Sequence, residues 1–179
     1  MPRRKSSPNG RPEIKDDSPD GGPPYVVRRS RIHGRGVFAV RAIPKGTRII
    51  EYTGRRISNA LADELYGDRE GTPGHTFLFE LDDDVVIDAG QGGNAARWIN
   101  HSCDPNCEAV EEDGRIFIDA IRAIAAGEEL GYDYGIVVEA PPSASERRRW
   151  PCYCGASGCR RTLLATDRPP AQTGIGSAA

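Results

Sequence analysis

The sequence predicts a mainly β protein, of the β-rich α+β class, whose main domain covers residues 25–140. Short segments rich in β-branched and aromatic residues recur along this stretch, and they are typical of strands. The chain of 179 residues also contains 21 Gly and 14 Pro, which favours turns and short elements over long helices. There is no internal repeat and no heptad pattern. The predicted strands cover residues 25–30, 34–40, 47–54, 75–81, 85–90 and 115–121.

Two pairs of these segments are close enough in sequence to form hairpins. The stretch 77–89, FLFELDDDVVIDA, places a run of Asp between two apolar segments. The stretch 108–120, EAVEEDGRIFIDA, contains Asp113-Gly114, and Asp-Gly between alternating apolar residues is a strong signal for a tight turn. We therefore expect an antiparallel hairpin in each stretch.

Helical structure is predicted in two short places. In residues 58–67, SNALADELYG, Ser58 is suited to cap a helix, and Leu61 and Leu65 would share one face. Residues 94–101, NAARWINH, are compatible with one short helical turn.

Composition changes at both ends of the chain. Residues 1–24 and 166–179 are poor in large apolar side chains, so they cannot bury enough surface to offset the entropy lost on ordering. We interpret both as disordered tails. Residues 141–165 would form a separate small segment after the main domain.

Charge and apolar content exclude some classes of function. With 24 Lys and Arg against 26 Asp and Glu, the net charge of -2 disfavours direct nucleic-acid binding, and no apolar run approaches the roughly 20 residues of a membrane span. The N-terminus MPRRKSSPNG lacks the apolar run of a signal peptide. An intracellular location is therefore expected, where the five cysteines would be thiols or metal ligands rather than disulfides.

Three cysteines in eight residues indicate a metal site near the C-terminus. Cys152, Cys154 and Cys159 lie in CYCGASGC, where glycines allow the backbone to turn. Structural zinc takes four ligands, so a fourth is needed, and Cys103, Cys107 and the three histidines are candidates. The alternative is three reduced, unligated thiols in a loop, which would be liable to oxidation.

Three motifs in order resemble those of a known family. RWINHSCDPNC at 97–107, GEELGYDYG at 127–135 and CYCGASGC at 152–159 are similar to the SET-domain protein-lysine methyltransferases that carry a post-SET zinc segment. The resemblance extends upstream to residues 30–54 and covers roughly residues 25–165. It implies small curved sheets around a pseudoknot-like core, followed by the zinc-binding post-SET segment.

The resemblance implies a cofactor and a metal. S-adenosylmethionine (SAM) would contact Asn100, His101, Arg97 and the loop Gly34, Arg35 and Gly36. Taken alone, this loop could be an ordinary turn, and Arg97 could form a surface salt bridge. Cys103 would be the fourth ligand of a structural zinc ion, with Cys152, Cys154 and Cys159. Cys107, His33 and His75 receive no role.

The resemblance also implies which residues carry the reaction, methyl transfer to a lysine amine. Tyr134 matches the catalytic tyrosine, which would orient the amine, although an isolated tyrosine would more simply be a core residue. Tyr132 would hold the amine and restrict added methyl groups, which favours mono- or dimethylation. Tyr52 would line the lysine channel or pack as a strand residue. Phe77 and Gly131 replace a Tyr and a Thr that relatives often have, so one channel hydroxyl would be missing and one strand loosened.

Two other functions compete with a lysine methyltransferase. The chain could be a non-enzymatic interaction module that uses a SET-like groove, or a zinc-dependent nucleic-acid binder through the ERRRW patch at 146–150. The intact motifs argue against the first and the net charge against the second. The expected partner is a histone or another basic protein, with no membrane. The sequence leaves open the oligomeric state, and the compartment: nucleus, bacterial cytoplasm, or export to a host.

Overall fold

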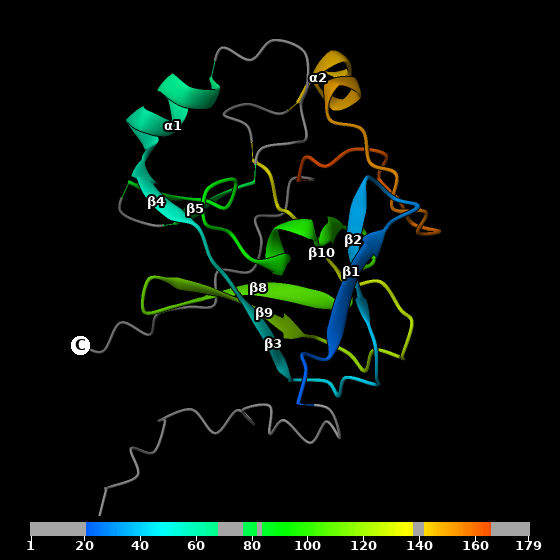
Figure 1. Ribbon diagram of the computed structural model, residues 1–179. Helices are drawn as coiled ribbons and strands as arrows, with labels where there is room; N and C mark the ends of the chain where they lie inside the picture. The colour runs from blue at the N-terminus through cyan, green and yellow to red at the C-terminus, as the bar shows by residue number, and fades with distance from the viewer. Residues whose placement is uncertain (1–20, 68–76, 82–83, 138–141, 166–179) are drawn as a thin grey trace, which may run out of the picture.

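The architecture is mainly β, which confirms the predicted fold class. The structure, a computed structural model, describes residues 21–67, 77–81, 84–137 and 142–165. Figure 1 shows α1, β4 and β5 on one side of the molecule and the β1–β2 hairpin on the other, with β3, β9 and β8 below α1, β4 and β5 and beside β1. The described strands are β1 (Tyr25–Arg29), β2 (Arg35–Ala39), β3 (Arg48–Tyr52), β4 (Arg55–Ser58), β5 (Leu78–Leu81), β6 (Val85–Asp88), β7 (Asn100–His101), β8 (Cys107–Glu112), β9 (Arg115–Ala120) and β10 (Gly131–Tyr132).

The strands form four small sheets rather than one large one. Two are antiparallel and three-stranded, with the orders β3-β9-β8 and β4-β6-β5. The antiparallel pair β1-β2 and the parallel pair β7-β10 complete the set. Short sheets of this kind are expected from a chain that Gly and Pro interrupt so often.

The core forms around β9, the central strand of its sheet. All residues from Ile116 to Ala120 are buried, because neighbouring strands cover the edges and other elements cover both faces. Ile118 is fully buried, and it pairs with Ala109 on β8 and Ile50 on β3. Such a strand carries apolar side chains on both faces instead of alternating with polar ones.

Both predicted hairpins are confirmed. In the β8–β9 hairpin, Asp113 and Gly114 have φ values of 52° and 67°, the left-handed conformation that a tight two-residue turn requires. Strands β5 and β6 pair in register from Leu78↔Asp88 to Leu81↔Val85. Residues 82–83 of the connecting Asp run lie outside the described residues.

The predicted helix at 58–67 is confirmed as α1 (Asn59–Tyr66), and its buried residue is Ala62 rather than either member of the predicted Leu61–Leu65 pair. Ser58 caps it by accepting a hydrogen bond from the backbone N–H of Leu61. Leu65 is 37% exposed, whereas Ala62 is buried and packs with Leu61 and Tyr66 against the β4–β6 pair. One helical turn places Ala62 and Tyr66 together on this side, so the larger Leu65 faces away.

The described residues contain two further short helices. The turn predicted at 94–101 is a 3-10 helix, η1 (Ala95–Trp98), which Asn94 caps. The sequence analysis did not predict α2 (Ala144–Arg149), which contains most of the ERRRW patch. Ser143 and Glu146 form a reciprocal capping box, and the S-x-x-E spacing was the signal available for it. No helix among the described residues is long and apolar enough to cross a membrane.

The division into domains stays a prediction. Residues 1–20 and 166–179 lie outside the described part, as does His75. Pro24 is buried, and its carbonyl accepts a hydrogen bond from the Val40 backbone.

Replacing Ile118 by Ala is expected to lower the free energy of unfolding by about 2–5 kcal/mol, because it leaves a cavity at the centre of the main core. Urea unfolding followed by circular dichroism measures this. Glu108→Ala, on the exposed side of β8, should change stability by no more than about 0.5 kcal/mol. Equal effects of the two substitutions would contradict a core centred on β9.

Candidate functional site

A cavity of about 780 Å³ runs between the small sheets, within the size range of ligand sites. We call it the site cavity. Its walls come from the β1–β2 turn, α1, β5, η1, the β7 and β10 strands and Trp150 after α2. The residues that line it and carry chemistry are His33, Arg35, Tyr52, Asp63, Glu80, Arg97, Asn100, Tyr132 and Tyr134.

The three predicted tyrosines line this one cavity. Tyr52 is 4% exposed and Tyr132 is 7% exposed, yet no hydrogen bond to either hydroxyl is found among the described residues. Burial raises the pKa of both phenols well above its ordinary value, so they stay neutral at physiological pH. Buried phenols normally find a partner, so two unpartnered hydroxyls in a cavity wall indicate a place for a polar ligand.

Tyr134 is held more firmly than the other two. Its hydroxyl donates to the carbonyl of Ile99 at 2.8 Å, and its backbone N–H donates to His101 Nδ1 at 3.2 Å. The ring centroid lies 4.9 Å from that of Tyr132. Desolvation raises the pKa of this phenol as well. The hydroxyl is thus fixed, neutral and still next to the cavity.

A cationic wall lies beside η1. The guanidinium of Arg97 stacks on Trp98 at 4.9 Å from the ring centroid and donates to the Ala89 carbonyl at 3.0 Å. Its Nε is buried and has no hydrogen-bond partner. Arg35 lies over the same Trp98 ring at 5.2 Å. An orphaned donor at a cavity wall suits an anionic or acceptor group of a ligand. The alternative role for Arg97, a surface salt bridge, is not found among the described residues.

Asn100 lines the cavity in a fixed orientation. Its Nδ2 donates to the Arg35 carbonyl at 2.9 Å and to Glu129 Oε1 at 2.8 Å, while Ser30 Oγ donates to Glu129 Oε2 at 3.0 Å. Both amide protons are therefore used within the protein, and the remaining carbonyl oxygen of Asn100 can serve a ligand as an acceptor. The sequence analysis missed Glu129, because a Glu in GEEL gives no sign of a partner so far away in the chain.

The three residues of the predicted glycine loop differ in position. Gly34, with φ of 45°, and Arg35 line the site cavity, but Gly36 is buried in β2 and does not. A Cβ at position 36 would collide with the carboxylate of Glu129. The physical need for glycine there is the close approach of Glu129.

His101 is also behind the cavity wall rather than in it. It is 3% exposed, and burial lowers its pKa to about 4, so the imidazole is neutral at pH 7. Nδ1 accepts from the Tyr134 backbone, which leaves Nε2–H to donate to Cys103 Sγ at 3.3 Å. His101 therefore connects the tyrosine motif to the cysteine cluster.

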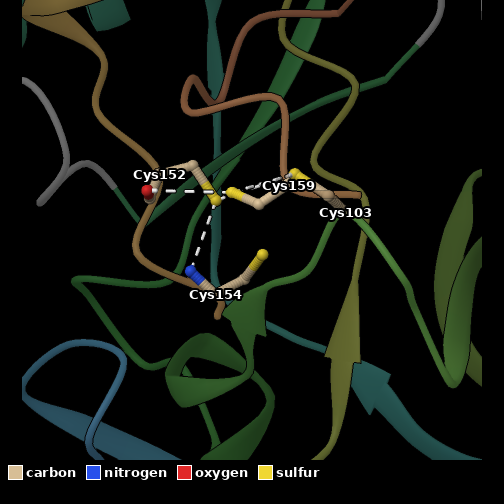
Figure 2. A group of neighbouring side chains, drawn as sticks. All are labelled: Cys103, Cys152, Cys154 and Cys159. Atoms are coloured by element: carbon tan, nitrogen blue, oxygen red, sulfur yellow. Dashed lines mark hydrogen bonds between the residues drawn. The ribbon is translucent and has the colours of Figure 1, made fainter. Parts of the chain in front are cut away.

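Four cysteines meet where the C-terminal segment touches β7 (Figure 2). The sulfurs of Cys103, Cys152, Cys154 and Cys159 all lie within 4.8 Å of one another. Cys103 Sγ is 3.7 Å from Cys152 Sγ and 4.0 Å from Cys159 Sγ. A zinc ion with Zn–S bonds of about 2.3 Å requires sulfurs about 3.8 Å apart. The cluster could thus hold a tetrahedral metal ion, and of the sequence candidates Cys103 is the one positioned as the fourth ligand.

Cys107 is separate from this cluster. It is 1% exposed and belongs to the main core, where burial raises the pKa of its thiol to about 12. The thiol stays protonated and acts as a small apolar side chain.

An ion pair ties the cysteine segment to the tyrosine motif. Arg160, next to Cys159, donates to both carboxylate oxygens of Asp133 at 2.6 Å, and Asp133 stands between Tyr132 and Tyr134. The guanidinium lowers the pKa of this carboxyl against the opposing effect of burial, so the pair is charged at neutral pH. The sequence analysis did not single out either residue.

The comparisons with known proteins agree with this geometry. The family model described as the SET domain matches residues 34–135. The chain is 45% identical over 141 residues to histone-lysine N-methyltransferase 2B of Homo sapiens, which covers 76% of this chain. It is 43% identical over 146 residues, 78% of this chain, to histone-lysine N-methyltransferase trithorax of Drosophila virilis. It is 46% identical over 140 residues, 75% of this chain, to the H3 lysine-4 specific histone-lysine N-methyltransferase of Schizosaccharomyces pombe.

The chain belongs to the SET-domain family. Its aligned part makes up only 5%, 4% and 14% of the length of these three relatives, respectively.

We expect the purified chain to carry one metal ion bound by the four clustered cysteines. Cys103→Ser or Cys154→Ser should lose most of the ion, because a serine hydroxyl is a poor substitute for a thiolate ligand. Elemental analysis by mass spectrometry gives the content. Cys107→Ser is the matched control and should keep the ion. Retention by all cysteine variants, or loss from the control, would contradict this assignment.

Proposed function

We propose that this chain is a SAM-dependent protein-lysine N-methyltransferase that acts on histones or other basic proteins. The observation that carries the proposal is the meeting of Tyr52, Tyr132 and Tyr134 with Asn100 and Arg97 around one cavity. Membership of the SET-domain family and the printed activities of the relatives support it. Because one relative is H3 lysine-4 specific by name, the N-terminal tail of histone H3 is the first substrate to test.

The tyrosines would prepare the lysine amine. A free lysine has a pKa of about 10.4, so deprotonation at neutral pH costs about 4 kcal/mol if the protein gives no help. A narrow aromatic channel disfavours the ammonium form, which lowers this cost. The neutral hydroxyl of Tyr134, fixed by the Ile99 carbonyl, would orient the amine without adding a charge.

The cationic wall and Asn100 would hold SAM. The Nε of Arg97 lacks a partner, Arg35 is nearby, and the Asn100 amide is fixed with its carbonyl oxygen available. When bound, SAM supplies a methyl group on a sulfonium centre. His101 would not contact SAM through its side chain, because both of its ring nitrogens already have partners.

The cysteine cluster would hold zinc in a structural role. Four sulfur ligands with no open position suit a structural site rather than a catalytic one. Cys103 follows β7, whereas the other ligands come from the C-terminal segment, so the ion would fasten this segment against the tyrosine motif. Trp150, which precedes those ligands, would then be held in the cavity wall.

The state of methylation would be limited by Tyr132. Its hydroxyl lies in the cavity without a partner, so it can hold the amine and occupy space that further methyl groups would need. We therefore propose that mono- and dimethylated lysine are the main products.

Isotope-labelled SAM should transfer label to histone H3, and Tyr134→Phe should reduce the rate about 100-fold or more because the amine loses its orientation. Binding of SAM, measured by calorimetry, should change little in this variant. A thermal melt checks that loss of the bond to Ile99 has not unfolded the protein. Label on no protein from a panel of histones, ribosomal proteins and cell extract, despite SAM binding, would contradict the proposed activity.

Tyr132→Phe should shift the products toward trimethyllysine, as read by mass spectrometry of the labelled peptide. Stability should hardly change, because no described group loses a hydrogen bond when this hydroxyl is removed. Efficient trimethylation by the unmodified protein would contradict the role given to this hydroxyl.

A further inference from the structure

The charges around the site cavity are segregated. Its cationic side chains come from the β1–β2 turn and η1, and they are Arg35 and Arg97. Its acidic side chains come from elsewhere, Asp63 from α1 and Glu80 from β5. Figure 1 shows α1 and β5 on the opposite side of the molecule from the β1–β2 hairpin. The cavity therefore has a cationic end and an acidic end.

The acidic end is open to a ligand. Asp63 and Glu80 are both exposed, and neither carboxylate makes an ion pair or hydrogen bond within the part of the chain that the structure describes. By contrast, the acidic groups Glu51, Asp119, Glu128 and Asp133 are all occupied by arginines.

The cavity between the two ends is built to receive a polar group. Tyr132 and Tyr52 are more than nine-tenths buried, line the cavity, and have hydroxyls without a partner among the described residues. Phe79, which precedes Glu80 on β5, connects these rings: its centroid lies 5.4 Å from that of Tyr52 and 6.5 Å from that of Tyr132. Successive residues of a strand point to opposite faces, so Glu80 shares the face of β5 on which Leu78 packs in the cluster with Ala62 of α1. The acidic end thus lies on the α1 side of β5, and the tyrosines lie on the side of Phe79.

The acidic end is also attached rigidly to the core. The Tyr66 hydroxyl at the end of α1 donates to Asp88 Oδ2 at 2.8 Å, and Asp88 is 1% exposed at the end of β6. Glu80 on β5 pairs with Val86, which also belongs to β6. The two carboxylates therefore come from elements fixed to one buried strand, which lowers the entropy cost of using them together.

We propose that Asp63 and Glu80 form a subsite for a cationic side chain, Arg or Lys, that flanks the lysine to be methylated. This subsite rests on the proposed methyltransferase function and adds a selection rule to it: neighbouring basic residues raise affinity through charge attraction at the acidic end of the cavity. A substrate lysine flanked by acidic residues is rejected by repulsion at the same place.

The test uses the full metal-loaded chain and a fluorescent peptide of the histone H3 N-terminus. Each cationic residue that flanks a lysine in this peptide is replaced singly by Ala or Glu. We measure the binding of each peptide by fluorescence anisotropy and its methylation by labelled SAM. Replacement of the recognised residue by Ala should weaken binding about two- to fivefold, as expected for exposed charge pairs, with kcat little changed.

Protein variants identify the carboxylates. Asp63→Asn with Glu80→Gln should remove the preference for the cationic flank. Glu108→Gln with Glu111→Gln, at two exposed positions of β8, removes the same net charge and should keep the preference for the cationic flank. Asp63→Lys with Glu80→Lys should invert the preference toward the Glu-flanked peptide, a rescue that a merely structural role would not produce.

The outcomes separate the two proposals. Methylation without any dependence on flanking charge overturns the subsite and leaves the methyltransferase function intact. Charge-dependent binding without turnover of any peptide supports the subsite and contradicts the proposed activity. Neither binding nor turnover contradicts both, and loss of the preference in the β8 control assigns the effect to overall charge and overturns the subsite.

Discussion

The structure depends on the polar contact between two motifs that lie about thirty residues apart in the chain. Strands β7 and β10 pair in parallel over two residues only, so side chains must supply the remaining order. The buried Asn106 accepts a hydrogen bond from the Gly131 backbone at 2.9 Å, and its Nδ2 donates to the Glu129 carbonyl at 2.8 Å. Ser102 N–H donates to the Tyr132 carbonyl at 3.0 Å. Gly131 permits this closeness, because a Cβ there would lie 3.0 Å from that of Ser102.

The site follows from this contact. The same pairing brings Asn100 to the cavity wall and places Tyr132 and Tyr134 beside it. His101 lies between the tyrosine backbone and Cys103, and the Asp133–Arg160 pair crosses from the same motif to the cysteine segment. A short polar seam thus orders the cavity on one side and the cysteine cluster on the other. Apolar packing alone would not order the cavity and the cluster in this way, because hydrogen bonds are directional and fix the orientation of side chains.

Two residues of the predicted cofactor motifs make contacts within the protein that the motifs alone did not indicate. Gly36 belongs to the expected loop but does not line the cavity, and its missing side chain makes room for Glu129. His101 belongs to the expected cofactor motif, yet its ring is buried behind Tyr134. In both cases the choice of residue is explained by a contact between distant segments of the chain. These contacts support the residues that face the cavity.

The sequence by itself determined the mainly β class, both hairpins, the helix cap at Ser58, the three neighbouring cysteines of CYCGASGC and the family, because these depend on local turn chemistry, periodicity and short motifs. It missed α2 despite the capping spacing at Ser143, and it did not indicate that Ala62 is the buried residue of α1. Only the tertiary structure decided that Cys103 rather than Cys107 joins the cluster, that Glu129 orients Asn100, and that Asp63 and Glu80 share a cavity with the tyrosines. The physical reason is that such pairings join segments far apart in the chain, and their partners are set by how the small sheets pack.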